Sequence, residues 1–449
     1  MKKAIAVVVA VAVSLMVGLV LFAPPFERTP PQLKVPPEGS YIGAKAVFVI
    51  EAEDRPTGLK EASVALVQEG RTWSLYSQSF SPGTYRLQVP LSFEPKGLGI
   101  REGAATLEVR VRDRSLWRFG RGNVAVARVK LLVDYTPPRV ELMANTRYIY
   151  FNGAGAVLFR TSLDASRAGV QVGNLFFKAF FRKEGQTLLG AALFGIPQYA
   201  KAREAHLVVK DRAGNQRVLP LSFDILPRRV PKDRVSLSEA FIREKIYPLL
   251  PPEKADLPPE EAFKAVNEEM RQRDEALISR MASHSSPEPM WHGAFLQMPN
   301  SKVTATFGDR RTYLYKGKVI GHSIHLGYDL ASVAHAPVPA ANKGRVLYTG
   351  FIGIYGNVVM VDHGLGLVSF YAHLSRYRVE EGDVVEKGDI IGYTDSTGLA
   401  GGDHLHFGIL LCGHPVDPVE WWDEKWLRER VMAVLQPFLG DGGRKGEGG

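Results

Sequence analysis

The chain has 449 residues, a formal net charge of +9 and a single cysteine, Cys412. Its length exceeds what one ordinary hydrophobic core supports, and 45% apolar and 23% charged residues exclude a wholly disordered or collagen-like chain. A single cysteine also excludes an intrachain disulfide and a cysteine-rich metal module, so we expect a globular protein of two to four domains.

Charge is unevenly distributed along the chain. Residues 24–235 hold 32 Lys and Arg against 19 Asp and Glu, whereas residues 236–449 hold 22 against 28. The basic half either faces an anionic partner or keeps the protein soluble. A net charge of this size over this length does not indicate nucleic-acid binding, and we expect no nucleic-acid partner.

The first 23 residues are expected to form a signal-anchor transmembrane helix. Lys2 and Lys3 precede an uncharged apolar run, Ala4 to Ala23, which as a helix would span about 30 Å, one hydrocarbon thickness. The alternative is a cleaved signal peptide, although the run exceeds the usual length of about 7–15 residues. The lysines favour a cytoplasmic N-terminus, so we expect one helix in the inner (cytoplasmic) membrane and the remaining chain on the extracytoplasmic, periplasmic side.

Residues 24–137 and 138–227 are expected to form two β-sandwich modules. A short pattern occurs twice, 98 residues apart: a strand ends in Asp113 or Asp211 and leads through a Gly-Asn turn into another strand. This ending resembles bacterial immunoglobulin-like extracytoplasmic modules, and the offset matches one such sandwich. The strand-like runs, separated by Gly, Pro and Asn, are Ala46–Glu51, Leu107–Arg112, Val124–Val133, Val157–Arg160, His206–Lys210 and Leu219–Ile225.

Residues 228–285 are expected to be a helical linker. Ser236-Leu-Ser-Glu239 has the form of a capping box, and Pro258-Pro259-Glu260 starts a second helix whose apolar stripe is interrupted by Asp274. This helix is either a linker that packs on the next domain or a lid over a site there. The tail 438–449 is rich in glycine and is expected to be disordered, because it cannot bury a core.

Ten of the eleven histidines lie at or after His284, and three groups of them stand in or beside strand-like sequence. On a strand, His404 and His406 would point to the same face about 6.6 Å apart. That spacing suits one metal ligand and one neighbour of a metal-bound water, and the alternative is a pair of surface histidines. The three groups are His325-Leu-Gly-Tyr-Asp329, Tyr371-Ala-His373-Leu-Ser375 and His404-Leu-His406-Phe-Gly408.

The first of these groups can supply a nitrogen and an oxygen ligand. Gly327 permits a tight turn, so that His325 and Asp329 can converge. Two nitrogens and one carboxylate around an open fourth position are typical of a catalytic zinc site, whereas structural sites fill all four positions.

The stretch 298–422 resembles the lysostaphin-type (LytM) zinc endopeptidases, metallopeptidase family 23. The resemblance covers a little over a quarter of the chain and implies a compact antiparallel β domain, here 286–437, that cuts peptides of peptidoglycan. The matching segments, in order, are Phe307-Gly308-Asp309-Arg310, His325 to Asp329, Tyr355-Gly356-Asn357, Tyr371 to Ser375, Gly382 to Gly392, His404 to Phe407, and Asp417-Pro418 with Trp421-Trp422.

The resemblance also assigns roles to five residues. It implies that His325, Asp329 and His406 bind Zn²⁺, and none of them is substituted here. It implies that His373 and His404 flank the zinc-bound water and the scissile carbonyl. Which of the two acts as base and which stabilises the oxyanion stays open.

We therefore expect a mainly β protein that is a zinc metalloendopeptidase hydrolysing peptide cross-bridges of peptidoglycan in the cell envelope. The bond stays open among a D-Ala–diaminopimelate bond, a glycine bridge and another peptide. The alternative is a non-enzymatic LytM-type regulator of a separate cell-wall amidase; such regulators typically lack the zinc ligands. A third interpretation is a wall-binding protein in which the basic β modules do the main work.

Overall fold

The computed structural model describes residues 2–22, 24–200 and 203–440. Helix α1 (Lys2–Phe22) covers most of the expected anchor, and residues 1 and 23 at the ends of that segment lie outside the described part. A search of the described residues finds no helix with the length and hydropathy needed to span a bilayer. Of the expected tail, residues 441–449 also lie outside the described part.

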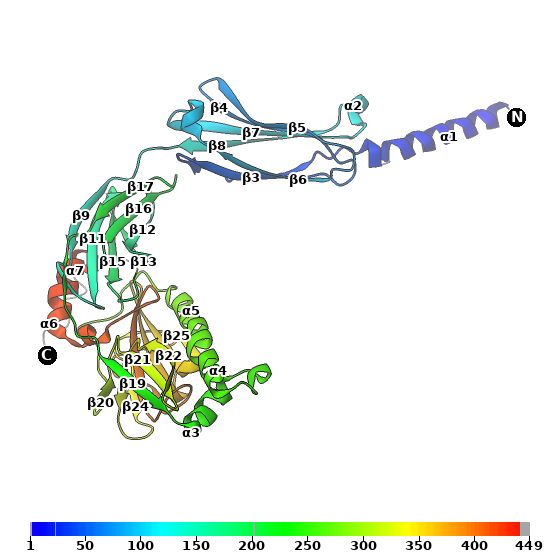
Figure 1. The fold of residues 1–449 in the computed structure, drawn as a ribbon. Helices are drawn as coiled ribbons and strands as arrows, with labels where there is room; N and C mark the ends of the chain where they lie inside the picture. Colours follow the sequence, from blue (N-terminus) through cyan, green and yellow to red (C-terminus); the bar gives the residue numbers. More distant parts are fainter. Residues whose placement is uncertain (1, 23, 201–202, 441–449) are drawn as a thin grey trace. The chain divides into compact units, whose positions relative to one another are not determined.

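The first compact unit, residues 1–137 with 210–216, is built from two β-sheets. Its strands are β1 (Gln32–Lys34), β2 (Ser40–Ile42), β3 (Ala46–Glu53), β4 (Leu59–Gln68), β5 (Arg71–Ser79), β6 (Arg86–Phe93), β7 (Gly103–Asp113) and β8 (Val124–Val133), with a short helix α2 (Trp117–Gly120). One sheet has the order β1-β3-β6 and the other β2-β8-β7-β4-β5 (Figure 1). Every second residue of β7, such as Leu107 and Val109, is buried in the core, as a half-buried strand requires.

The repeated Asp and Asn residues make the same side-chain arrangement in both places. Asp113 accepts hydrogen bonds from the backbone N (2.7 Å) and the Nδ2 (2.8 Å) of Asn123. Asp211 accepts the equivalent bonds from Asn215, at 2.9 and 3.0 Å. Each carboxylate therefore closes the turn that follows its strand, which is a physical reason for the repeat. The immunoglobulin-like class of the modules stays a prediction.

The second compact unit, residues 138–209 with 217–449, begins with two further four-stranded sheets, and two of their strands extend into residues 210–216. Its strands are β9 (Val140–Asn145), β10 (Tyr148–Tyr150), β11 (Ala154–Ser162), β12 (Ala165–Val172), β13 (Leu175–Lys178), β14 (Phe180–Glu184), β15 (Thr187–Gly195), β16 (Ala205–Asp211), β17 (Gln216–Pro220) and β18 (Asp224–Leu226). The sheet orders are β14-β15-β11-β9 and β13-β12-β16-β17, and β10 pairs with β18. Five of the six expected strand runs lie within β3, β7, β8, β11 and β16, and the sixth is divided between β17 and β18.

The C-terminal part of the chain forms a large antiparallel sheet. Its strands are β20 (Lys302–Ala305), β21 (Arg310–Tyr315), β22 (Lys318–Ile324), β23 (Tyr328–Ala331), β24 (Pro337–Pro339), β25 (Gly344–Ile352), β26 (Gly356–Gly364), β27 (Leu367–Tyr377), β28 (Val384–Val385), β29 (Ile390–Thr394), β30 (Leu405–Leu411) and β31 (His414–Val416). The main sheet runs β20-β23-β30-β27-β26-β25-β28, whereas β21 and β22 belong to a separate small sheet. Helices α6 (Glu424–Trp426) and α7 (Ala433–Leu439) follow.

This sheet and the preceding β module share one hydrophobic core. A single cluster of buried side chains runs from Ile149 to Phe438 and includes residues of both parts. Arg228 reinforces the junction, because its guanidinium pairs with Asp417 (2.6 Å) and Glu420 (3.2 Å), two buried carboxylates. Helix α7 packs on β11 and β15, so the expected tail starts too early: Phe438 is buried and helical.

The expected helical linker begins with a strand. Strand β19 (Lys232–Leu237) pairs in parallel with β21, and helix α3 (Glu239–Phe241) follows with Ser238 as its N-cap. Further on, α4 (Pro259–Lys264), a π-helical turn (Ala265–Met270) and α5 (Arg271–Ala282) form one continuous helical stretch. Asp274 does not break the buried stripe as expected, because it is itself buried and accepts a hydrogen bond from Ile354 N (2.8 Å).

Candidate active site

Two neighbouring strands and the turn before one of them bring three side chains together. In the antiparallel pair of β23 and β30, Asp329 lies directly opposite His406. His325 stands just before β23, and Gly327 between them has no room for a side chain. A Cβ there would lie 2.6 Å from both His406 Nε2 and Phe407 O, so the close approach of this turn requires glycine.

The three side chains form a compact donor group. His325 Nε2 lies 2.9 Å from Asp329 Oδ1 and 3.0 Å from His406 Nδ1. His406 Nδ1 lies 3.1 Å from Asp329 Oδ1, and the three ligand atoms all lie within 4.8 Å of one another. Two imidazole nitrogens and one carboxylate oxygen at this spacing fit a divalent transition metal with a position left open.

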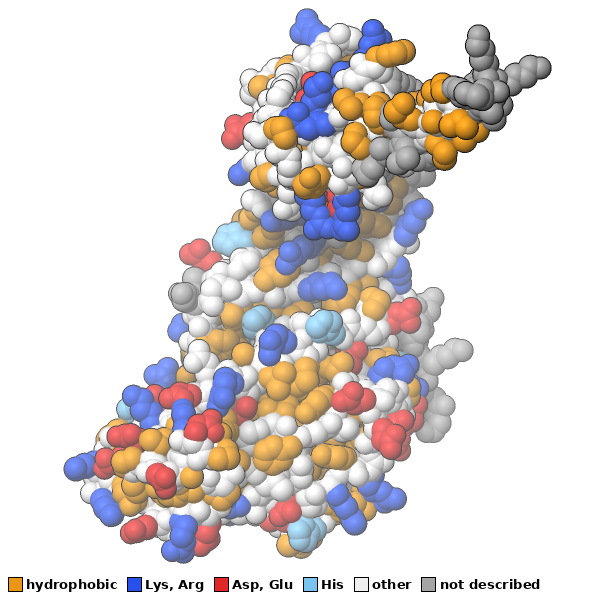
Figure 2. Space-filling view, turned by 90° about the vertical axis from the view of Figure 1, so that its right-hand side faces the viewer, with side chains coloured by type: hydrophobic (Ala, Val, Ile, Leu, Met, Phe, Trp, Pro, Cys, Tyr) orange, Lys and Arg blue, Asp and Glu red, His pale blue; other side chains and the backbone are white. Residues whose placement is uncertain are grey.

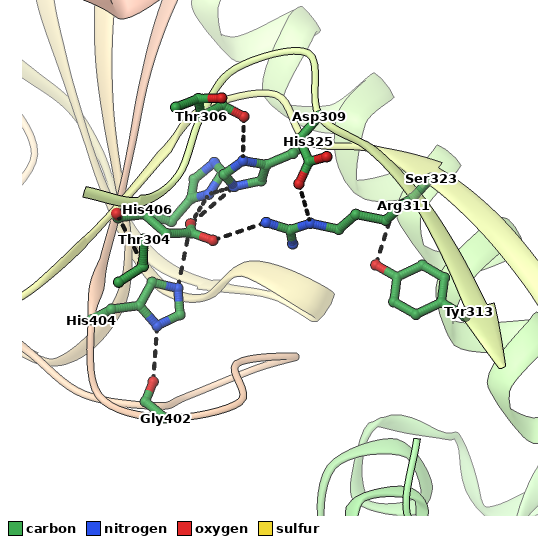
Figure 3. Close-up of polar contacts among 11 residues, drawn as sticks. Thr304, Thr306, Asp309, Arg311, Tyr313, Ser323, His325, Gly402, His404 and His406 are labelled. Carbon is green, nitrogen blue, oxygen red and sulfur yellow. Dashed lines mark hydrogen bonds and ion pairs between the residues drawn. The ribbon is translucent and has the colours of Figure 1, made fainter. Parts of the chain in front are cut away.

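Surrounding groups orient these donors, as is usual around a metal site. His325 Nδ1 lies 3.0 Å from Thr306 O, which leaves Nε2 free to face the group. Arg311 donates from Nη2 to Asp329 Oδ2 (3.1 Å) and from Nε to Asp309 Oδ2 (3.3 Å). Figure 3 shows the guanidinium of Arg311 directed at this group, beside Asp309. Arg311 thus holds the second oxygen of Asp329 and leaves Oδ1 for the other donors.

His373 and His404 stand beside the donor group. The His373 ring centroid lies 4.9 Å from that of His404 and 5.9 Å from that of His406. His373 Nδ1 lies 2.7 Å from Thr397 O, and His404 Nδ1 lies 2.8 Å from Gly402 O. A carbonyl only accepts, so each Nδ1 carries a proton and each Nε2 is available to the site. His404 Nε2 lies 3.4 Å from Asp329 Oδ1.

Burial and charge set the protonation of the group. Burial alone would raise the pKa of Asp329, but His325 and the hydrogen bonds from the histidines hold it well below its usual value. Burial lowers the pKa of His406 to about 4 and that of His373 well below the usual histidine value. At His404 burial acts in the same direction, but Asp329 outweighs it and raises the pKa. A carboxylate and a neutral imidazole are the states that metal ligands require.

All five predicted residues line one cavity of about 410 Å³. The expectation that His404 and His406 face one cleft is therefore met, although His404 lies just outside β30. The cavity has a second wall made by the segment before the sheet: Val235, Ser236, Leu237, Ser238, Phe241, Phe263 and Arg271. The expected linker is thus part of the groove itself.

Arg311 is not among the candidates that the sequence offers. Arg311 directly follows the Phe307–Arg310 segment, and that adjacency was the only available signal. The helix after Pro258, expected to be either a packed linker or a lid over a site, contributes Phe263 and Arg271 to the cavity lining and forms what we call the helical wall. Two further residues of this domain have structural roles outside the donor group. His363 is a buried structural histidine, 2.7 Å from both Lys343 O and Ser369 Oγ, and the Cys412 thiol packs against Lys178 O (3.8 Å), away from the donor group.

Residues 323–418 match the profile of peptidase family M23. This segment is an M23 peptidase domain. The expected family is therefore confirmed over this part of the chain, and all five site residues lie within the M23 domain. Arg311 and the helical wall lie outside the matched residues.

Curated relatives are similar over the same region. DD-carboxypeptidase/endopeptidase Mpg of Neisseria meningitidis serogroup B is 37% identical over 121 residues, which are 26% of each chain. Peptidoglycan DD-endopeptidase ShyB of Vibrio cholerae is 30% identical over 131 residues, 28% of this chain and 30% of that protein. The catalytic domain of lysostaphin from Staphylococcus simulans is 29% identical over 28% of this chain and 94% of that one, with a TM-score of 0.24. The chain spans between a quarter and a third of the length of these curated relatives.

Proposed function

We propose that the protein is a zinc metalloendopeptidase that hydrolyses peptide cross-bridges of peptidoglycan. The observation that carries this proposal is the meeting of His325, Asp329 and His406 with two further histidines in one cavity of the M23 domain. Relatives with the same domain are named peptidoglycan DD-endopeptidases, which supports the substrate class.

The metal in this proposal is zinc. His325 Nε2, Asp329 Oδ1 and His406 Nδ1 would hold it, and imidazole with carboxylate is a donor set that zinc accepts. When bound at such a site, zinc polarises a peptide carbonyl and lowers the pKa of a coordinated water to about 7. Arg311 keeps Asp329 oriented, and the helical wall limits access of bulk water to the cavity.

The remaining two histidines would handle protons. Their Nε2 atoms face the cavity, because each Nδ1 is bound to a carbonyl oxygen. One imidazole in its neutral form can accept a proton from the attacking water, and a protonated one can donate a hydrogen bond to the tetrahedral oxyanion. Both orderings of His373 and His404 are consistent with this arrangement.

For the rest of the chain we propose an extracytoplasmic location, with the N-terminal apolar run Ala4 to Ala23 as the membrane anchor. The support is the apolar sequence after Lys2 and Lys3. The β modules, which would be immunoglobulin-like, space the M23 domain from the bilayer. On the face drawn in Figure 2, Lys and Arg side chains occur throughout, whereas most Asp and Glu side chains lie in the lower part. Such a basic surface suits an anionic cell wall.

The test is digestion of cross-linked sacculi by the purified full chain, with released muropeptides identified by mass spectrometry. The wild-type protein is expected to release new ends derived from cross-links, and a chelator is expected to abolish that release until zinc is restored. His406→Ala is expected to lower cleavage at least about 100-fold, because one of three ligands is lost, while its circular dichroism spectrum is retained. Full activity of His406→Ala would refute the metal assignment.

A further inference from the structure

A second cavity, of about 190 Å³, adjoins the first and shares His406, Leu326 and Tyr355 with it. Its floor is strand β30, on which His406, Gly408 and Leu410 point to the same face. Gly408 has no side chain and lies opposite Phe370 in β27, so the floor stays open beyond the donor group. The cavity is therefore a continuation of the groove along this strand.

Helix α5 and Tyr199 form the sides of this second cavity. Tyr199 is held in place by its hydroxyl, which donates to Pro415 O (3.0 Å). Helix α5 contributes Glu275, Ile278 and Ser279. The surface is mainly apolar, and no lysine or arginine lines it. Glu275 thus supplies the negative charge of this cavity.

The carboxylate of Glu275 has no hydrogen bond or ion pair with any described residue. The neighbouring charged residues of the helix do have hydrogen-bond partners. Asp274 accepts from Ile354 N (2.8 Å), and Arg271, one helical turn earlier, donates to Asn267 O and Oδ1 (both 3.1 Å). Glu275 is partly buried, and burial raises its pKa. Arg271 opposes that shift only through its charge, without a hydrogen bond to Glu275. A carboxylate in an apolar cavity without a hydrogen-bonded cation lowers stability, which a cationic ligand would offset.

We propose that this cavity binds an aliphatic ammonium group of the substrate, with Glu275 as its counterion, next to the cut bond. Apolar walls accommodate the methylene chain of such a group, and an ammonium offers three donors to a carboxylate. Glu275 is then a specificity-determining residue for peptides that carry a primary amine. The inference rests on the proposed peptidase function and names the class of peptide that is cut.

A competing role for Glu275 is the orientation of His406. No described residue bonds to His406 Nε2, and metal-binding histidines commonly donate this proton to a carboxylate. A bridging water could connect the two in the shared cavity. The two roles differ in their consequence, because an orienting residue acts on every substrate and an ammonium-binding residue acts only on cationic ones.

The experiment uses the full-length protein with zinc and three forms of sacculi. One form keeps its free amines, one is reductively dimethylated so that the charge stays, and one is acetylated so that the charge is lost. Initial rates of cross-link cleavage at low substrate report kcat/KM. The variants are Glu275→Gln and, as a matched control, Glu268→Gln, which removes the same charge from the solvent-exposed face of the same helical stretch.

We expect the wild-type protein and Glu268→Gln to cut native and dimethylated sacculi at least about tenfold faster than acetylated sacculi, since a charge-assisted hydrogen bond contributes on this scale. Glu275→Gln should cut native sacculi at the rate of acetylated ones, with its rate on acetylated sacculi unchanged. Equal slowing of Glu275→Gln on all three forms, or an unchanged preference, overturns the inference. Wild-type cleavage of all three at one rate refutes it and leaves the peptidase function intact, whereas no cleavage of any form refutes that function itself.

Discussion

The two β modules are similar in their strands but differ in what covers them. The first unit buries its own core, which runs from Ile42 to Val133 and contains residues of this unit alone. The module that follows has the same kind of strands and the same Asp–Asn arrangement, yet its core continues into the M23 domain. The pattern of strands therefore determines which sheets form. Whether those sheets make an independent module depends on which residues, from the same module or from the next domain, complete their hydrophobic core.

Truncation of one core side chain in each module gives the largest expected contrast. Phe194→Ala removes a fully buried ring from the shared core and is expected to cost about 3–5 kcal/mol, with loss of cleavage as the M23 domain unfolds. Leu107→Ala is expected to cost about 2–5 kcal/mol in the first unit and to leave cleavage unchanged. Urea unfolding followed by hydrogen exchange in each unit measures both. If both variants lost the same hydrogen-exchange protection in the M23 domain, the conclusion that the first unit has a separate core would be contradicted.

Acid is expected to destabilise the second unit through a buried histidine, a residue type that the first unit lacks. Burial lowers the pKa of His363 to about 4, below its unfolded value of about 6.5. Below pH 6.5 the unfolded chain therefore takes up the proton first, and stability falls by about 3 kcal/mol as the pH drops to 4. Residues 1–137 contain no histidine.

The measurement is the urea midpoint of each unit between pH 7 and pH 4. His363→Gln is the control, because glutamine can bond to Lys343 O and Ser369 Oγ without titrating. Its second unit should lose about 3 kcal/mol less than the wild type over this range. An identical acid loss in His363→Gln and the wild type would assign the effect to other groups.

The ion pairs of Arg228 at the junction allow a buried ion pair of the second unit to be compared with an exposed one of the first unit, with a smaller expected effect on stability. Arg228→Ala leaves Asp417 and Glu420 buried without their cation and is expected to cost about 2 kcal/mol in the second unit. The figure lies below that of a fully ionised pair, because burial raises the pKa of Glu420 to about 8, so that this carboxyl group is mostly neutral at pH 7.

Arg128→Ala is the matched change in the first unit. Arg128 pairs with Glu108 at 3.1 Å on an exposed strand face, where solvent screens the charges. No measurable shift of the unfolding midpoint is expected for it. A shift of the unfolding midpoint equal to that of Arg228→Ala would show that the buried ion pairs of the junction stabilise the fold no more than an exposed ion pair does.

The strands and the meeting of the five candidate site residues were predictable from the sequence, and for different reasons. Val124–Val133 has the expected bounds, because an alternating apolar run that begins after a Gly-Asn turn leaves few other structures. The histidine groups were found because residues that hold metals are few in kind and closely spaced in a strand or turn. Their meeting in one cavity follows from the pairing of β30 with both β23 and β27.

The segment 228–285 was predicted less well. Its first residues form β19, since β21 offers a strand edge with which they pair, and no local pattern reveals such a partner. The sequence predicts that Asp274 interrupts an apolar stripe, but the backbone N of Ile354 donates a hydrogen bond to its carboxylate and allows its burial. Arg311 and Glu275 gain their roles only from what packs around them.

By itself, the sequence determined the mainly β character, the apolar N-terminal run and the histidine groups of the M23 domain, because each is a local property of composition and spacing. The tertiary structure decided which module stands alone, which strand joins β21, and that α5 forms a wall of the groove with an unpartnered carboxylate. These features depend on contacts between residues far apart in the chain, such as Arg228 with Glu420 and Glu275 with the cavity of His406. A local sequence pattern does not identify partners that are distant in the chain, because their interaction energies exist only in the folded structure.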